Sequence, residues 1–284
     1  MTDNDGLRID HKGHSVRLKW HRLRRSLADP PFGLAVMEEG FRLGASMELD
    51  LQRRADGGFV VLHDDTLDRE TTGQGPVALR SANELSALSY RDQPSRLMLS
   101  EDLSALQKTA HPAALLQFDM KNTAQDVGPQ GIDHFAAHFA QDCDQIIISG
   151  GDLDLIRALA ERIPDLKRGY DPTDDLLDLC ATAGLGGMER HLLGVLRDRV
   201  KPDMIYLQWE MILTSARMGF DMIALAHAEG VTVDAWTHSM AHPSQGFSDA
   251  EWHDFSALLA LRPDQITTDE PVATQRAYVL RAST

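Results

Sequence analysis

Eight segments with the composition of buried strands alternate with helical segments along the sequence, which predicts an α/β protein of the (β/α)8 barrel class. Two further observations favour a barrel over an open sheet. A length of 284 residues suits one such domain, and polar titratable residues follow the carboxyl ends of predicted strands, where active sites of this fold lie. We expect a single domain over residues 1–284, with its core at about 15–280 and a loop insertion at about 64–110.

The first predicted strand is short and delivers polar residues at its carboxyl end. Val16, Leu18 and Trp20 alternate with polar neighbours, and His21 and Arg22 follow directly. The sequence Asp-Pro-Pro at 29–31 then interrupts the chain before a helix expected at about 32–43.

The second predicted strand carries two acidic residues. Side chains two positions apart on a strand share a face, so Glu48 and Asp50 lie side by side while Met47 and Leu49 fill the other face. Repulsion between two such carboxylates favours a bound cation or a shared proton. The alternative is a surface strand on which both acids form the solvated face.

A hairpin is expected after this strand. The connection at 53–58 ends in Asp-Gly-Gly, which is a strong hairpin signal and is too short for a parallel crossover. The apolar run at 59–62 then returns along the second strand, which brings His63 back toward Asp50. A histidine beside two carboxylates suggests proton transfer. In the alternative, His63 and Asp64 only cap the following turn.

The remaining elements alternate regularly after a turn-rich excursion. That excursion contains a capping box, Ser81 to Glu84, and a helix at 100–106. Further strands are expected at 114–119, 145–148, 166–168, 204–207, 231–236 and 265–268, the third of these being the weakest. Helices are expected up to about 141, at 153–162, 173–183, 188–196, 215–227 and 250–259, and from the last strand to about 280.

The composition narrows the possible functions. A formal charge of -15 argues against a general nucleic-acid binder, because phosphate backbones are bound by clustered basic residues. The one dense basic run is typical of a solvated or interaction face: Lys12, Arg17, Lys19, Arg22, Arg24 and Arg25. No segment resembles a signal peptide or reaches the length of a membrane span. Cys143 and Cys180 lack metal-type spacing, so reduced thiols and a cytoplasmic location are expected.

An ordered set of motifs connects these elements to a known family. The set comprises His21-Arg22, Glu48-x-Asp50 with Asp56-Gly57, Val60-x-Leu62-His63-Asp64, Leu67-x-Arg69-x-Thr71 with Gly73 and Gly75, Phe118-Asp119-Met120-Lys121, Val233 to Thr237, and Ile266 to Pro271. In this order, from about residue 15 to 275, the chain resembles the glycerophosphodiester phosphodiesterase family.

The resemblance implies a chemistry and a set of residues. The family fold is a barrel that hydrolyses phosphodiesters, such as glycerophosphodiesters, to an alcohol and sn-glycerol 3-phosphate. It implies one divalent cation, Mg²⁺ or Ca²⁺, on Glu48, Asp50 and Asp119, since oxygen ligands favour hard ions. His21 and His63 would serve as base and acid, in either order. The phosphate and substrate contacts would come from Arg22, Lys121 and Trp236.

The chain departs from the family pattern at several positions. Leu23 stands where the family has glycine after His-Arg, and Pro30-Pro31-Phe32 stands where Glu-Asn-Thr is expected. His11-Lys12-Gly13 competes with His21 for the first motif. Asp119 replaces a glutamate, and Trp236-Thr237 is followed by His238-Ser239 where the family has an asparagine nearby.

These departures leave other functions open. A lysophospholipase D-like enzyme or another phosphodiesterase would use the same cation, and a catalytically decayed barrel would only bind phosphate. The alternative role of Lys121 is to pair with the acidic cluster, and that of Trp236 is to pack in the core. The oligomeric state is not indicated. The other histidines are expected on surfaces or helices without a ligand partner: His134, His138, His191, His227, His242 and His253.

Overall fold

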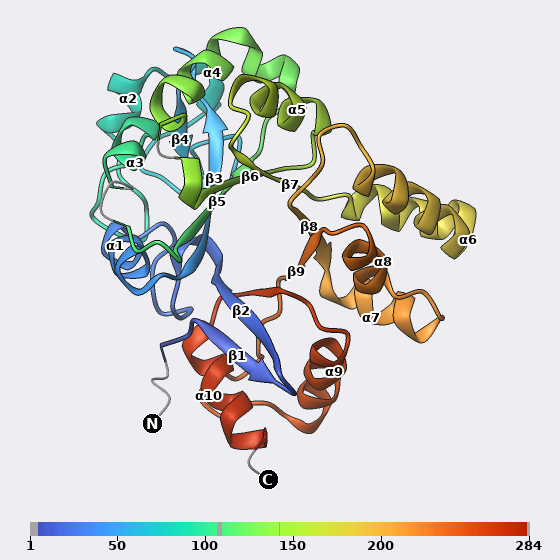
Figure 1. Cartoon of the computed structure of the whole chain (residues 1–284). Coiled ribbons are helices and arrows are strands. Elements are labelled where there is room, and N and C mark those ends of the chain that lie inside the picture. The colour runs from blue at the N-terminus through green and yellow to red at the C-terminus, as the bar shows by residue number, and fades with distance from the viewer. Residues whose placement is uncertain (1–4, 107–109, 142, 283–284) are drawn as a thin grey trace. The chain divides into compact units, whose positions relative to one another are not determined.

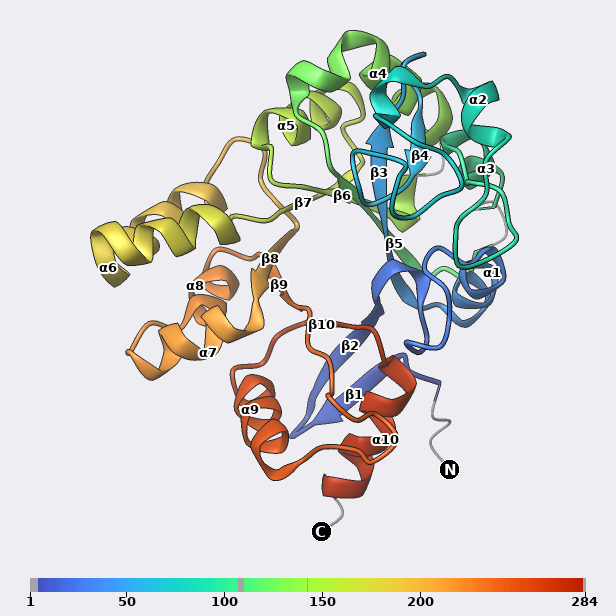
Figure 2. The same cartoon turned by 180° about the vertical axis from the view of Figure 1, so that it is seen from behind.

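The computed structural model describes residues 5–106, 110–141 and 143–282, which belong to two compact units. The terminal unit comprises Met1–Asp29 and Gly169–Thr284, and the central unit comprises Pro30–Arg168. Along the described chain, eight parallel strands alternate with helices, which confirms the predicted (β/α)8 barrel class (Figures 1 and 2). The single domain over residues 1–284 stays a prediction.

In the terminal unit the strands follow the order β1-β2-β10-β9-β8-β7. All pair in parallel except β1, which forms a hairpin with β2 that the sequence analysis did not predict. Their bounds are β1 Arg8–His11, β2 His14–Trp20, β7 Lys167–Tyr170, β8 Met204–Gln208, β9 Thr232–Trp236 and β10 Gln265–Thr268.

One expected helix of the terminal unit differs from the prediction. The expected helix at 215–227 is two helices, because Gly219 adopts a φ of 93° between them. The two helical segments expected at 173–183 and 188–196 are present within α6, on either side of a kink with non-helical backbone at Gly184. The elements are η1 His21–Leu23, α6 Thr173–Leu196, α7 Trp209–Arg217, α8 Met222–Ala228, α9 Asp249–Ala260 and α10 Pro271–Ala282, of which α10 packs on β1 and β2.

In the central unit the first half of β7 pairs with β6, and the order continues as β6-β5-β3-β4. Only β4 is antiparallel, as the Asp-Gly-Gly signal predicts. The strands are β3 Ser46–Arg53, β4 Phe59–Val61, β5 Leu115–Met120 and β6 Ile146–Ser149. The helices are α1 Leu34–Leu43, η2 Val77–Leu79, α2 Ala82–Ser86, α3 Ser100–Leu106, α4 Ala124–Phe139, η4 Cys143–Gln145 and α5 Leu153–Arg162. The predicted capping box of Ser81 and Glu84 is present at α2.

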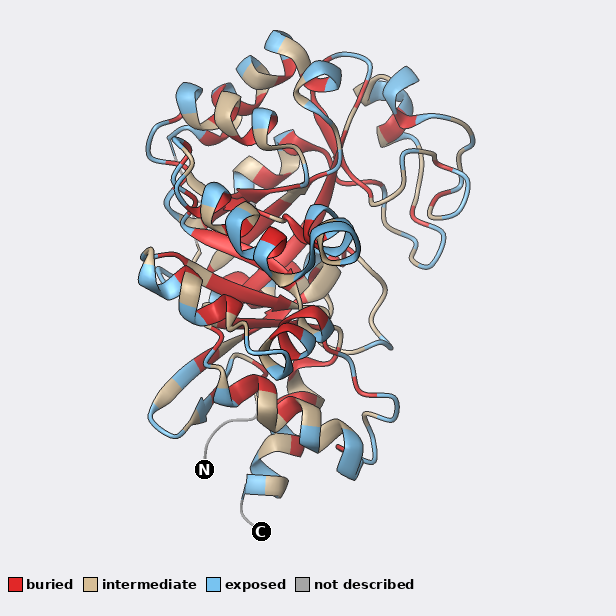
Figure 3. Cartoon of the chain, turned by 90° about the vertical axis from the view of Figure 1, so that its right-hand side faces the viewer, coloured by how far each residue is buried: buried red, intermediate tan, exposed pale blue. Residues whose placement is uncertain are grey.

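Within each unit the strands are more deeply buried than the helices. Figure 3 shows mostly buried strands and helices whose outward faces are exposed. On β3 the acidic face is buried as well, since Glu48 is 5% exposed and Asp50 1%. The alternative of a solvated acidic strand is therefore wrong. Lys19 of the basic run is also buried, 3.0 Å from Asp234, so that run is not entirely a solvated face. No described helix has both the length and the apolar character needed to cross a bilayer.

Candidate active site

Three carboxylates meet on the neighbouring strands β3 and β5 of the central unit. Glu48 and Asp50 share one face of β3, and the parallel register places Asp119 of β5 directly beside Asp50. Ligand oxygens of the three residues lie within 4.8 Å of one another. These three residues are here called the carboxylate cluster. Concentrated negative charge that is largely buried requires a positive partner.

Lys121 supplies positive charge to the cluster. Its Nζ lies 2.8 Å from an Asp50 carboxylate oxygen and also donates a hydrogen bond to Asp119. Burial alone would lower the pKa of Lys121, but Asp119, Asp50 and Glu48 together raise it above its ordinary value. The pairing role that the sequence analysis left open for Lys121 is therefore confirmed. A quarter of its side chain stays exposed, so the ammonium group can turn toward a ligand.

Neighbouring side chains fix the orientation of Asp119. Ser149 on β6 donates a hydrogen bond to its Oδ1 at 3.0 Å, and Gln117 donates to the Ser149 hydroxyl at 2.7 Å. Ser149 directly follows three buried isoleucines and is the last residue of β6, so the packing of this strand fixes the position of the hydroxyl group. These hydrogen bonds thus fix the position of the Asp119 carboxylate.

The hairpin brings His63 to the same end of β3. The backbone N–H of Leu62 donates to the carbonyl oxygen of Asp50 at 3.1 Å, and Gln52 Nε2 donates to the His63 carbonyl at 2.9 Å. The predicted return of the chain toward Asp50 is confirmed. The ring of His63 is partly exposed, and its Nδ1 lies 2.9 Å from an oxygen of Asp64. With Nδ1–H donating to Asp64, Nε2 is the nitrogen available for proton transfer.

Asp64 is held ionised beside His63. Hydrogen bonds from Arg69, reinforced by His63, lower the pKa of Asp64 to about 2. Glu70 accepts hydrogen bonds from the backbone N–H groups of both His63 and Asp64, each at 3.1 Å. The turn after β4 is therefore fixed by charged groups. His63, Asp64 and Glu70 also lie close enough to offer ligands to a metal ion, so His63 has more than one possible role.

In the terminal unit, His21 follows the carboxyl end of β2, as predicted. Its Nδ1 lies 2.9 Å from Asp269 Oδ1, and Asp269 also accepts from the Ser239 hydroxyl at 3.2 Å. Burial acts to raise the pKa of Asp269, but the hydrogen bond and charge of His21, together with Arg24, lower it overall. His21 thus has the same arrangement as His63, with a carboxylate on Nδ1.

The backbone after His21 is strained. Arg22 has a φ of 51° and Leu23 a φ of 56°, the left-handed region in which a side chain costs about 1–2 kcal/mol per residue. Leu23 occupies the position of the family glycine, and its fully buried side chain compensates part of that cost.

The competing histidine lies at the other end of the strand. His11 pairs with His14 at the amino end of β2, and its Nδ1 contacts the Tyr278 hydroxyl at 3.2 Å. At the carboxyl end of β9, Trp236 is partly exposed, as a substrate contact requires. His238 is buried against the rings of Trp209, Phe247 and Phe255, which makes it a packing residue.

Each of the two units contains some of the predicted site residues. The central unit brings together Glu48, Asp50, Asp119 and Lys121, with His63 held at the same end of β3. The terminal unit holds His21, Arg22 and Trp236 at the carboxyl ends of β2 and β9. Sequence reasoning gave no role to Asp269 or Ser149. The position of Asp269 directly after the last strand was the available signal.

The donor set of the carboxylate cluster fits a hard divalent cation. Three carboxylates on two adjacent strands offer only oxygen ligands, which Mg²⁺ and Ca²⁺ prefer over softer metals. Lys121 would have to release at least one of its two carboxylates to make room, and its partial exposure permits this. The cluster can therefore hold either an internal ammonium group or a metal ion.

Comparisons with known proteins identify a matching family and a shared fold. A model of the glycerophosphoryl diester phosphodiesterase family matches residues 33–273. Over 60 residues the chain is 40% identical to a glycerophosphodiester phosphodiesterase of Caldanaerobacter subterraneus subsp. tengcongensis, a match that spans 21% of the chain and only 25% of that relative.

Solved structures share the fold at low sequence identity. One from Silicibacter pomeroyi has a TM-score of 0.71 at 19% identity, covering 98% of this chain and 97% of that one. A phosphodiesterase of Oleispira antarctica in complex with the product sn-glycerol-3-phosphate has a TM-score of 0.65 at 18% identity, covering 92% and 96%. A glycerophosphodiester phosphodiesterase of Thermotoga maritima has a TM-score of 0.63 at 16% sequence identity, and the match covers 94% of this chain and 99% of that one.

Proposed function

Because the chain belongs to the glycerophosphoryl diester phosphodiesterase family, we propose that it hydrolyses glycerophosphodiesters to an alcohol and sn-glycerol 3-phosphate. The observation that carries this proposal is the carboxylate cluster of Glu48, Asp50 and Asp119 with Lys121 among its oxygens. The cluster supplies cation ligands and Lys121 supplies a charge for an anionic phosphodiester. The product found on the Oleispira antarctica phosphodiesterase is an anion of the same class.

The proposed cofactor is one divalent cation, Mg²⁺ or Ca²⁺, held by the carboxylate cluster. When bound, such a cation polarises a phosphoryl oxygen and lowers the pKa of a coordinated hydroxyl group. Ser149 would keep Asp119 in place for this role through its 3.0 Å hydrogen bond. Lys121, which pairs with Asp50 and Asp119, would contact the phosphate through its partly exposed ammonium group.

His21 and His63 are the proposed base and acid. Each has a carboxylate on Nδ1, Asp269 for His21 and Asp64 for His63, which leaves Nε2 to exchange a proton with substrate. Arg22, next to His21, is proposed to contact the phosphate, and Trp236 to pack against an apolar part of the substrate. We expect His21→Ala or His63→Ala to lower kcat by about 10²–10⁴ without loss of folding.

A substrate panel tests the proposal. The purified protein is incubated separately with glycerophosphocholine, a lysophospholipid, a cyclic phosphate and bis(p-nitrophenyl) phosphate. The product measured is sn-glycerol 3-phosphate from the first, the head-group alcohol from the second, the phosphomonoester from the third and p-nitrophenol from the fourth. Hydrolysis of glycerophosphocholine that His63→Ala removes is the expected result. Preference for the lysophospholipid would assign a lysophospholipase D-like activity instead. Phosphate binding without turnover of any substrate would identify a catalytically decayed barrel and contradict the proposal.

Two expectations from the sequence accompany this function. The cytoplasmic location stays a prediction, to be checked by fractionation of the producing cell. Nucleic acid is not expected as a partner, because the chain carries a formal charge of -15. The oligomeric state is open and can be measured by light scattering.

A further inference from the structure

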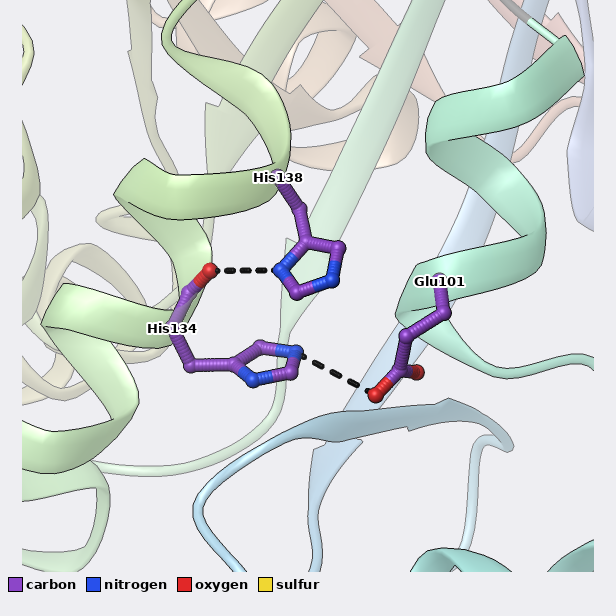
Figure 4. Close-up of side chains that lie close together, drawn as sticks. All are labelled: Glu101, His134 and His138. Atoms are coloured by element: carbon purple, nitrogen blue, oxygen red, sulfur yellow. Dashed lines mark hydrogen bonds and ion pairs between the residues drawn. The ribbon is translucent and has the colours of Figure 1, made fainter.

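A second group of metal-binding side chains lies in the central unit, outside the carboxylate cluster. His134 and His138 come from successive turns of α4, and Glu101 comes from the start of α3 (Figure 4). Each offers a ligand atom, and these atoms all lie within 4.8 Å of one another. Both histidines were predicted to lack a ligand partner, but Glu101 of another helix offers a carboxylate oxygen 3.7 Å from His134 Nε2.

The two imidazoles are arranged as ligands of one ion. Residues four apart on a helix lie one above the other, and the two rings stack with their centroids 4.2 Å apart. His138 Nδ1 lies 2.9 Å from the carbonyl oxygen of His134, which makes it the protonated nitrogen and leaves Nε2 as the ligand. A backbone carbonyl on the other ring nitrogen is the usual support of a metal-bound histidine.

The carboxylate of Glu101 faces these rings. Its Oε1 lies 3.7 Å from His134 Nε2, a separation that one shared ion can bridge. In a tetrahedral zinc site with ligand atoms about 2.1 Å from the ion, two ligand atoms lie about 3.4 Å apart. The ligand atoms of this group lie within 4.8 Å of one another, so the widest separation has to close by at most about 1.4 Å, which side-chain rotation can supply. Part of the Glu101 side chain is exposed, so an ion can enter from solvent.

The surrounding charges leave a net negative site. Arg54 forms hydrogen bonds to both oxygens of Glu101, and it also pairs with Asp56 at 2.6 Å. One buried guanidinium is thus shared by two carboxylates, which leaves one negative charge for a cation. A carboxylate has about four lone-pair positions, so Glu101 can accept the hydrogen bonds of Arg54 and bind an ion at the same time. Arg54 then orients the ligand.

We propose that Glu101, His134 and His138 form a second metal site, selective for Zn²⁺ or a similar borderline ion. Two imidazoles and one carboxylate are zinc ligands, and with three protein ligands a fourth position stays open for water. The ion ties α3, at the end of the loop excursion, to α4. The site does not depend on the proposed phosphodiesterase function.

A hydrogen-bond chain is the alternative reason for this cluster. The hydroxyl of Ser100 lies 2.8 Å from His134 Nε2 and 3.1 Å from Glu101 Oε2, so these three residues can hold α3 on α4 without a metal. His138 is not part of that chain. A substitution of His138 therefore separates the two explanations.

Zinc titration calorimetry on the full chain tests the proposal. We compare the wild type, Asp119→Asn to weaken the carboxylate cluster, and His138→Gln, with His253→Gln as a matched control. His253 is exposed on α9, so its loss removes a surface histidine only. The site predicts that the wild type, Asp119→Asn and His253→Gln bind this Zn²⁺ alike, and that His138→Gln binds it at least tenfold more weakly.

Two further measurements, of Tm and of Co²⁺ absorption, test the same site independently of calorimetry. Zn²⁺ should raise the Tm of Asp119→Asn but not of Asp119→Asn/His138→Gln, and Co²⁺ added to Asp119→Asn should give a d–d absorption band that the double variant lacks. Glu101→Gln, which keeps an oxygen for Arg54, should weaken Zn²⁺ binding as His138→Gln does. Equal zinc affinity of His138→Gln and His253→Gln, or no zinc bound by Asp119→Asn, overturns the proposal.

Discussion

The ammonium group of Lys121 lies 2.8 Å from Asp50 and contacts Asp119, two of the three acids expected to bind a cation. One positive group thus neutralises part of the carboxylate cluster in the structure. A divalent cation held as proposed would compete with Lys121 for the same oxygens. Its binding would then release the lysine to contact the phosphodiester.

Lys121→Met tests this competition. Removing the ammonium should strengthen Mg²⁺ or Ca²⁺ binding to the carboxylate cluster, because the cation no longer has to displace it. The same change should lower kcat/KM for glycerophosphocholine by about 10–100-fold, since a charge-assisted hydrogen bond contributes about 1.5–3 kcal/mol. Calorimetry and steady-state kinetics on one preparation measure both. Weaker cation binding by Lys121→Met would show that the lysine supports the metal instead.

Asp269→Asn tests the support of His21. The substitution keeps the size of the side chain but removes the charge that orients Nδ1, so kcat should fall by about 10²-fold while KM changes little. Ser239→Ala is the control, because it removes only the 3.2 Å hydrogen bond to Asp269 and should cost much less. An Asp269→Asn enzyme with wild-type kcat would remove His21 from the proposed mechanism.

His238→Phe tests a pH-dependent term in stability. Burial lowers the pKa of His238 to about 4, while an unfolded histidine titrates near ~6.5. Between these values the unfolded chain binds more protons, so the free energy of unfolding falls as the pH drops from about 6.5 to 4, by up to about 3 kcal/mol. Denaturant unfolding at several pH values should show a smaller fall for His238→Phe. Parallel curves for the two proteins would contradict this assignment.

Gly58→Ala tests the packing of the hairpin. A Cβ at this position would lie 2.1 Å from Arg54 Nη2, so the guanidinium would have to leave Asp56 and Glu101. Overpacking of this kind costs about 1–3 kcal/mol. Gly151→Ala is the matched control, because nothing lies within 4 Å of its added Cβ. Thermal unfolding should give a lower Tm for Gly58→Ala alone, and equal Tm values would exclude the clash.

Much of the fold follows from local patterns in the sequence. The eight parallel strands and the β3–β4 hairpin carry strong signals, namely apolar runs and the Asp-Gly-Gly turn. The strand Arg8–His11 was missed because its residues are mostly polar and half exposed. The start of α7 at Trp209 was missed because it follows β8 directly, with no side-chain cap to mark it.

Periodicity and turn signals predicted part of the site, namely the shared face of Glu48 and Asp50 and the return of His63 toward Asp50. Glu48 and Asp50 share a face by strand periodicity, which any such strand would show. The support of His21 by Asp269 and the approach of Glu101 to His134 are tertiary contacts between distant elements. No local pattern encodes these contacts.

The most direct test of the account is the hydrolysis of glycerophosphocholine with and without a divalent cation. After EDTA treatment and buffer exchange, the wild type should be inactive, and Mg²⁺ or Ca²⁺ should restore release of sn-glycerol 3-phosphate. The same cation should fail to restore a Glu48→Gln/Asp119→Asn variant. Full turnover by the cation-free wild type, or by that variant, would contradict the claim that the carboxylate cluster holds the metal on which the reaction depends.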